Sequence, residues 1–451
     1  MWWRGKIPSP AQEESGSYED DQMIEELTKK LKNVCDEFAI AENYENIKEL
    51  RFSNNSMDLF NNWEESYTDV FASRNKKTMD ILIKDYNNID YYIEKIDKTL
   101  NMIPDNPSYY GINPEHYNYS SGEEDIDEVD IYDLSQQLID ASLKNKTDQN
   151  AGLIYKNYAK TRIKTNYNDE TYYNSGIEIV LRSFKGDYSG QEGLHYGIDA
   201  VKNIDPYKIG ENAAETALNG NNKIDINEGK YDVLMSPYLI GTILTYNIGF
   251  LSYFDIDSGL SPFIGKLNEN IASKNVNLYD DPLNKNGIGF TPVDEEGTMT
   301  EKLDLISNGT LKNYMHSYST ARKAGVKTTG NAGIISPSPW QIHMEKGNKD
   351  INDMISSMDS GLYINNSWYT RFQDERTGTF STVPRDGVFL VKNGEIKGNV
   401  SGIRISDSIL NILKNITEIS NEEKYVKWWD EIHSSIMPSV KAENINITKG
   451  F

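Results

Sequence analysis

Hydrophobic and polar positions divide the 451-residue chain into a helical start, a region of short strands and a long uncharged centre. Apolar residues recur at three- and four-residue spacing from Met23 through Leu31 to Phe38, which predicts an amphipathic helix. β-Branched and aromatic runs then predict strands at Glu37–Tyr44, Lys48–Ser53, Thr68–Ala72, Thr78–Lys84, Ile154–Lys164 and Ile177–Phe184. Helical periodicity returns at Ile89–Met102, Leu134–Lys144 and Ile209–Leu218.

The uncharged centre runs from Val233 to Phe254, in a chain with 25% charged residues. Ser236 and Pro237 interrupt this segment, so it predicts a strand ending at Met235, a Ser cap, a first-turn Pro and then a helix. The helix expected from Leu239 to Phe254 has no polar face, which is typical of a helix enclosed by protein. A membrane span is the less favoured alternative, because polar residues follow the interruption.

Two Asn-Gly pairs, Asn308-Gly309 and Asn393-Gly394, lie between apolar strand residues and predict type I′ hairpins. The sequence therefore predicts an α+β protein, with an N-terminal mixed sheet and helices, and a C-terminal domain rich in antiparallel sheet around a buried central helix. We expect a disordered extension at 1–22, an α+β domain at 23–218 and the β-rich domain at 219–451.

Charge and cysteine content limit the classes of function and the cellular compartments that fit this sequence. A formal net charge of -23 disfavours sequence-independent binding of nucleic acid, which needs Lys and Arg to neutralise phosphates. The single cysteine, Cys35, lies beside the first helical stripe and is expected to be a buried structural thiol in a reducing compartment. The start of the sequence lacks the apolar core of a signal peptide, so a cytoplasmic location is expected.

The common catalytic motifs do not occur in the sequence: it has no GxSxG elbow, Walker loop, dinucleotide fingerprint or CxxC pair. No two histidines fall within one helical turn, which excludes a zinc site on a single helix. The five are His116, His195, His316, His343 and His433. A hydrolase that combines Ser and Asp with His316 or His343 remains an alternative, although packed histidines are the simpler interpretation.

Three segments give the chain a resemblance to the TldD/PmbA family of peptidase subunits. Residues 294–333 contain an acidic-glycine turn, a hairpin and Tyr318, Thr320, Ala321 and Arg322 before a Gly-Asn loop. Residues 361–396 resemble the family's later strands, with Thr377-Gly378, Phe380 and the second Asn-Gly pair. The N-terminal half matches more loosely, at RSFKGD (182–187) and DPYKIGENAAETAL (205–218).

In the family's zinc subunit the central helix carries HExxxH, two zinc-binding histidines and a general-base glutamate. The resemblance places Thr245, Tyr246 and Phe250 at those positions, and none of these side chains does that work. The zinc subunit also uses a cysteine late in its C-terminal domain, whereas Cys35 is near the start here. We therefore expect no metal and no catalytic residue in this chain. Gly249 is expected to permit a locally widened turn before Phe250.

The resemblance implies the metal-free, PmbA-type (TldE-like) subunit of a heterodimeric peptidase. A TldD-like homologue would hold the zinc, and peptides or unfolded chains would be the substrate. Neither nucleic acid nor membrane is an expected partner. The alternative is a stand-alone, homodimeric peptide-binding or scaffolding protein without proteolysis. Neither the physiological substrate nor the residues that line a peptide groove follow from the sequence.

Overall fold

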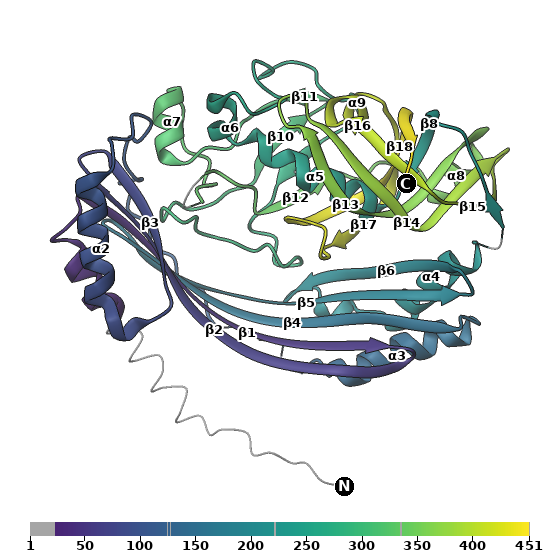
Figure 1. Cartoon of the computed structure of the whole chain (residues 1–451), viewed down its shortest axis with the longest axis horizontal. Helices are drawn as coiled ribbons and strands as arrows, with labels where there is room; N and C mark the ends of the chain where they lie inside the picture. The colour runs from purple at the N-terminus through teal and green to yellow at the C-terminus, as the bar shows by residue number, and fades with distance from the viewer. Residues whose placement is uncertain (1–22, 124, 127, 221, 334–335, 451) are drawn as a thin grey trace, which may run out of the picture.

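The protein is built on two β-sheets with helices packed against both (Figure 1). A computed structural model describes residues 23–450 apart from 124, 127, 221, 334 and 335. The extension expected to be disordered, 1–22, lies outside the described residues. Both sheets and their helices agree with the α+β class predicted from the sequence. The first sheet ends at Gly197 and the second begins at Lys223, and the domain boundary expected near 219 stays a prediction.

The first sheet has six strands in the order β3-β2-β1-β4-β5-β6, and every strand pair is antiparallel. The prediction of a mixed N-terminal sheet was therefore wrong. Tight turns explain the antiparallel order: β1 and β2 are joined at Asn54 and Asn55, which have φ of 48° and 65°. The strands are β1 (Glu37–Ser53), β2 (Ser56–Arg74), β3 (Lys77–Ile83), β4 (Gln149–Thr165), β5 (Asp169–Lys185) and β6 (Tyr188–Gly197).

Helices cover the two ends of this sheet. Residues 23–31 are helical and pack with α2 (Ile89–Met102) at one end. At the other end lie α3 (Ile131–Lys144) and α4 (Pro206–Leu218), on β1, β4 and β5. The first helix stops at residue 31, so its expected continuation to Phe38 was wrong: Phe38 belongs to β1, because the Glu37–Ser73 pairing draws that segment into the sheet.

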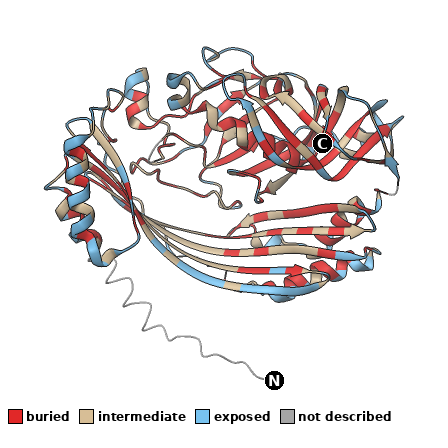
Figure 2. Ribbon diagram, in the orientation of Figure 1, coloured by how far each residue is buried: buried red, intermediate tan, exposed pale blue. Residues whose placement is uncertain are grey.

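The middle of the long strands lies between these two covers and stays half-buried. In β1 all residues from Glu42 to Lys48 are partly accessible. Figure 2 shows the same change along the curved strands, from red ends to a tan centre. The sheet is therefore a wall with two capped ends and an accessible central band.

The second sheet holds twelve strands within the described residues and is mainly antiparallel, as predicted. Three of its pairs are parallel: β12–β18, β13–β8 and β15–β7. Its strands are β7 (Lys223–Ile224), β8 (Gly229–Met235), β9 (Leu278–Asp280), β10 (Leu303–Ser307), β11 (Thr310–Leu311), β12 (Gln341–Met344), β13 (Ser360–Asp374), β14 (Thr379–Lys392), β15 (Glu395–Val400), β16 (Ile403–Ser408), β17 (Ile416–Val426) and β18 (Ser434–Lys449). The helices here are α5 (Pro237–Ile248), α6 (Tyr253–Ser258), α7 (Tyr318–Ala324), α8 (Ile351–Ser356) and α9 (Ile409–Lys414).

Helix α5 is the buried centre of this half, as the uncharged segment predicted. Ser236 accepts hydrogen bonds from the backbone N–H groups of Tyr238 and Leu239, and Pro237 occupies the first turn. Every residue of α5 except Tyr246 is buried. No helix in the described parts of the chain is long and apolar enough to cross a membrane.

The helix does not continue to Phe254. It ends at Ile248, a 3-10 turn covers Gly249–Leu251, and α6 follows. The expected widened turn was wrong, because a 3-10 turn is tighter than an α-helix. Backbone pairing explains the break: Tyr253 donates to the carbonyl of Met315 and Met315 donates to that of Leu251, both at 2.9 Å. Phe254, expected in the core, is 45% exposed on α6.

Both Asn-Gly hairpins are confirmed. Asn308 and Gly309 have φ of 48° and 75°, and join β10 to β11. Asn393 and Gly394 have φ of 51° and 74°, and join β14 to β15. Positive φ at both central residues is the requirement of a type I′ turn.

Candidate functional site

The positions that the resemblance assigns to the metal site, Thr245, Tyr246 and Phe250, lie where α5 and the turn after it meet β13 and the loop 427–433. Tyr246, on α5, is the helix's only accessible side chain. Its hydroxyl lies 3.2 Å from Arg371 Nη1, which donates to it, and 3.4 Å from Asp430 Oδ1, to which it donates. Burial raises the pKa of both Tyr246 and Asp430 above their ordinary values. This hydroxyl is therefore neutral near pH 7 and is held by Arg371 and Asp430.

Thr245 and Phe250, the other two positions, are occupied by packing contacts. The Thr245 hydroxyl donates to the carbonyl of Thr242 at 3.3 Å, inside its own helix. The ring of Phe250 packs edge-on against Phe372 of β13, with centroids 4.9 Å apart. The structure thus places Tyr246 and Phe250 on one aromatic surface against β13 and turns Thr245 into the core.

Two adjacent carboxyl groups of the loop 427–433 lie beside α5. Asp430 accepts from the backbone N–H of Thr370 at 3.2 Å, which ties the loop to β13. Glu431 accepts from the Ser435 hydroxyl at 3.2 Å, and its Oε1 lies 2.4 Å from where a Cβ on Gly241 would stand. Burial raises the pKa of Glu431 well above its ordinary value. A glycine at 241 thus admits this carboxyl group against the helix backbone.

These residues do not fit a zinc ion. Protein zinc sites take three or four ligands from His, Cys, Asp or Glu. Here one of the three helix positions is a hydrocarbon ring, one hydroxyl is bonded within its own helix, and the other is held by Arg371. Within residues 23–450, less the five that are not described, no group of three or more His, Cys, Asp or Glu is arranged to hold a metal.

In the described part of the chain, neither histidine ring considered for a hydrolase hydrogen-bonds to a serine. His343 of β12 bonds to the Tyr279 hydroxyl at 2.9 Å and to Glu423 Oε2 at 3.1 Å. His316 precedes α7; its Nδ1 lies 3.3 Å from Thr320 Oγ1, and its ring packs against Tyr253. Burial lowers the pKa of His316 to about 4, so its ring is neutral. Both are packed histidines, which was the simpler interpretation.

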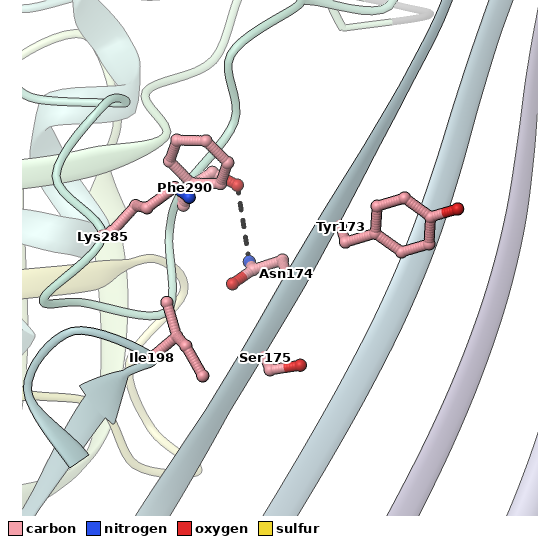
Figure 3. Close-up of a pocket in the computed structure, with 6 residues that line it drawn as sticks. All are labelled: Tyr173, Asn174, Ser175, Ile198, Lys285 and Phe290. Atoms are coloured by element: carbon pink, nitrogen blue, oxygen red, sulfur yellow. Dashed lines mark hydrogen bonds between the residues drawn. The ribbon is translucent and has the colours of Figure 1, made fainter. Parts of the chain in front are cut away.

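A small pocket lies elsewhere, where β5 meets the segment 285–290 (Figure 3). Asn174 donates to the carbonyls of Ile288 and Phe290, at 2.8 and 3.4 Å, and Lys285 lies over the Phe290 ring. Its cavity volume of about 10 Å³ has room for about one water molecule, far less than a small-molecule site needs. The pocket contains none of the three positions on α5.

Sequence reasoning missed the residues that surround Tyr246: Arg371, Asp430 and an aromatic group formed by Trp368, Tyr369, Trp428 and Trp429. The Trp-Trp-Asp run at 428–430 was the available signal, because two adjacent tryptophans beside an acid are rare on a simple surface. The two tryptophans contact β13 next to a bulge in that strand, and the hydrophobic pattern of the sequence does not predict this bulge.

Comparison with known proteins shows which class of protein the C-terminal half resembles. Residues 228–449 match the model of the PmbA/TldA metallopeptidase C-terminal domain. A metalloprotease of Methanothermobacter thermautotrophicus is 27% identical over 270 residues, covering 58% of this chain and 57% of the relative. A metalloprotease TldD homolog of Buchnera aphidicola is 30% identical over 234 residues, covering 49% of this chain and 48% of the relative. The chain thus spans about half the length of these curated relatives.

The fold agrees over a longer range. The crystal structure of TldE from Thermococcus kodakarensis superposes with a TM-score of 0.80 at 20% identity, covering 94% of this chain and 100% of that one. The C-terminal half is therefore a domain of the metallopeptidase type. Residues 228–449 belong to the TldD/PmbA family, and 94% of the chain shares the fold of that TldE structure.

Proposed function

We propose that this chain is the non-catalytic, metal-free subunit of a heterodimeric, cytoplasmic peptidase of the TldD/PmbA family. The observation that carries the proposal is the filling of the metal position on α5. Arg371 and Asp430 hold the Tyr246 hydroxyl, and the Phe250 ring packs on Phe372. No carboxylate stands on the helix to deprotonate a bound water, because the position of the glutamate is Tyr246.

The zinc in this proposal belongs to a TldD-like partner, and the substrate is a peptide or an unfolded chain. The half-buried band of the first sheet supports a role as part of the chamber that encloses the substrate. A sheet surface that is neither core nor fully solvated is suited to an interior wall. Its polar and aromatic side chains, such as Tyr44 and Tyr158, contact one another across the strands.

An unpaired strand edge supports association with a partner. β3 pairs only with Thr68–Arg74 of β2. Within the described residues, the segment of β2 from Ser56 to Tyr67 therefore has no neighbouring strand on the side away from β1. The exposed apolar side chains on this edge segment are Met57, Leu59, Phe60 and Trp63. Long exposed apolar edges are sites where another chain adds a strand.

The charge of this edge favours a different chain over a second copy. It carries Asp58, Glu64 and Glu65 and has no Lys or Arg between Ser56 and Tyr67. In an antiparallel self-pairing centred between Asn61 and Asn62, Asp58 would face Glu65. Like charges directly opposite are destabilising, and the net charge of -23 adds repulsion between copies. The homodimeric alternative is therefore the weaker one.

Metal analysis and reconstitution test the proposal. The purified chain should contain no stoichiometric zinc and cleave no unfolded peptide. Mixed with an HExxxH-bearing homologue from the same genome, it should give chelator-sensitive cleavage. His→Ala substitution in the partner's motif should abolish that activity, whereas Thr245→Ala and Phe250→Leu here should change kcat/KM by less than about twofold.

Two results would contradict the proposal. One tightly held zinc per chain, lost together with a peptidase activity of the isolated protein, would make this subunit the catalyst. Recovery of only self-associated chains from the native host, with no HExxxH homologue, would favour the stand-alone binding protein.

A further inference from the structure

An exposed group of rings and guanidinium groups borders the Tyr246 position. It consists of the exposed Tyr369, Arg371, Arg385 and Trp429, the half-buried Trp368 and the exposed Ile432 beside them, and we call it the aromatic-arginine patch. Trp429, Ile432 and Tyr369 are 54%, 52% and 46% exposed, in a chain that buries most of its large apolar side chains. Arg371 connects the patch to the site, because its Nη1 donates to the Tyr246 hydroxyl. The patch is therefore continuous with the metal position of the family.

A bulge in β13 turns Tyr369 outward. The register of β13 against β14 shifts between Trp368 and Arg371, and Tyr369 has φ of 60°. A non-glycine residue in this region is strained by about 1 kcal/mol or more and persists only where its surroundings hold it. Asp430 supplies that support, because it accepts from the backbone N–H of Thr370. The protein thus maintains a strained backbone that presents an aromatic ring to solvent.

The rings form a continuous surface. Trp429 contacts Tyr369 and Trp368 edge-on, with centroids 5.5 and 5.4 Å apart. Trp368 also contacts Trp428, which is buried and donates to the Thr242 hydroxyl of α5 at 3.0 Å. The exposed rings therefore rest on a rigid base anchored in the central helix. Little conformational entropy is lost when they contact a bound ring.

Arg385 brings positive charge to the same surface. Its guanidinium lies 4.9 Å from the Trp368 ring and 5.9 Å from the Tyr369 ring. No carboxylate pairs with it in the described parts of the chain, whereas Arg182 on the same Trp368 ring bonds to Asp386. The Arg371 side chain is 63% exposed, and its only ion pair among the described residues, with Asp430, is at 4.0 Å. In a chain of net charge -23, this is a local site for one anionic group.

We propose that the aromatic-arginine patch binds the C-terminal end of a peptide whose last residue is aromatic, with the free α-carboxylate on Arg385 and the ring against Tyr369 and Trp429. This inference deepens the proposed function and rests on it, since it names the substrate feature that this subunit holds. A C-terminal aromatic residue carries its carboxylate about 5 Å from its ring centre. The Arg385 guanidinium lies 5.9 Å from the Tyr369 ring, so the two groups are close enough to contact the carboxylate and the ring of one terminal residue.

The charge of the whole chain selects a terminal carboxylate over acidic side chains. A peptide rich in Asp or Glu would be repelled by the net charge of -23, while a single terminal carboxylate meets the local guanidinium groups. Every peptide ends in such a group, so the patch recognises a chain end without reading a longer sequence. Ring stacking then adds the preference for an aromatic last residue.

Peptide binding to the isolated full-length chain tests the inference. The probe is an uncharged octapeptide ending in Phe, labelled at its N-terminus, in free-acid and C-terminal amide forms, followed by fluorescence anisotropy. The free acid should bind about tenfold or more tightly than the amide. Arg385→Gln should remove that difference, and Trp429→Ala should weaken both forms by roughly tenfold. Neither zinc nor cleavage enters this assay, so its failure is distinct from failure of the proposed function.

Matched variants complete the test. Arg376→Gln removes the same charge from an exposed arginine in the β13–β14 turn, and Tyr207→Ala removes a ring that is 55% exposed on α4. Both should retain the preference for the free acid. Equal binding of acid and amide, or the same loss in Arg376→Gln, would overturn the inference. A change in solution mass caused by Arg385→Gln would also overturn it, because the patch would then join copies of the chain.

Discussion

Buried carboxyl groups give the interior of this protein an acidic character at the residue scale. Burial raises the pKa of Asp280 to about 6, although Trp340, Gln341 and Asn331 all donate to it. Desolvation likewise raises the pKa of Glu178, which is half-buried on β5, to about 7. A carboxyl whose pKa is higher in the folded than in the unfolded state holds its proton more strongly when folded. Such groups therefore lower the stability as the pH rises between the two pKa values.

Glu178→Gln should remove one of these penalties. With an unfolded pKa near 4.3 and a folded pKa of about 7, the wild-type chain loses up to about 3 kcal/mol at Glu178 between pH 4 and pH 7. The difference in unfolding free energy between variant and wild type, measured by urea denaturation, should therefore be about 2 kcal/mol more in favour of the variant at pH 8 than at pH 5. Glu301→Gln, on an exposed glutamate, should show no such gain. An equal change at both pH values would refute the burial of a charge at Glu178.

Residue chemistry was predictable where a local rule dictates it. Ser236 caps α5, both Asn-Gly pairs form their turns, and Cys35 is a buried thiol, as the sequence indicated. The contacts of Tyr246 were not predictable, because Arg371 and Asp430 lie 125 and 184 positions away in the chain. Local patterns carry no information on such distant pairings.

At the element scale, the break after α5 shows tertiary pairing overriding helical propensity. The apolar pattern continues to Phe254, yet residues 251–253 hydrogen-bond to Met315 instead of extending the helix. Gly249 was expected to enable an irregular turn, but its φ of -51° is accessible to every residue. The irregularity therefore belongs to the pairing with Met315 and not to the glycine.

Gly249→Ala and Gly309→Ala should consequently have opposite effects. A Cβ at Gly249 would meet nothing within 4 Å, so alanine should stabilise the fold by about 0.5 kcal/mol through the unfolded state. At Gly309, φ is 75° and a Cβ would lie 2.4 Å from the carbonyl of Ala272, so alanine should cost about 2 kcal/mol. Thermal and urea unfolding of the two variants measure both signs. Destabilisation by Gly249→Ala would restore a conformational role for that glycine.

Helices and strands with strong periodicity were predictable from the sequence. Where neighbouring strand segments merge or bulge was not. Helix α2 has the predicted bounds, Ile89 and Met102. The runs Glu37–Tyr44 and Lys48–Ser53, predicted as two strands, form the single strand β1, because cross-strand hydrogen bonds continue through the polar residues between them. The β13 bulge that exposes Tyr369 had no signal, since one inserted residue leaves the local composition unchanged.

The two sheets are joined across the whole molecule by polar contacts. Arg182 of β5 donates to the buried Asp386 of β14 at 2.6 Å, and Asp386 also accepts from Ser189 and Asn366. Nearby, Asn365 donates to the carbonyl of Gln191 at 2.8 Å. These bonds hold the first sheet against the strands that carry the aromatic-arginine patch, so the two halves should unfold as one unit.

A double-mutant cycle on Arg182 and Asp386 should reveal this coupling. Asp386→Ala leaves Arg182 without its buried partner and should cost about 3 kcal/mol, and the cycle should give a coupling of about 2 kcal/mol in urea unfolding. The exposed pair Lys185–Asp148 of the first sheet is the control, with an expected coupling below about 1 kcal/mol. Equal coupling in the two cycles would mean that Arg182 and Asp386 do not hold the sheets together.

The class of the whole molecule was predictable from sequence, whereas the arrangement of its sheets was not. Alternating helix and strand patterns indicate α+β, but the long antiparallel wall depends on which strands pair. The central helix was found from its lack of charge, while the surface beside it is assembled from β5, β13, β14 and the loop 427–433. Such a surface exists only after folding.

The burial of Cys35 has a practical consequence for spectroscopy. Its thiol donates to the carbonyl of Leu31, is 9% exposed, and has a pKa raised to about 12 by burial. The thiolate is the form that attacks maleimide and nitroxide labelling reagents, so the native protein is nearly inert to them near neutral pH. A new cysteine on the strand edge or the loop 427–433 can then carry a single fluorophore or spin label without first removing the natural one.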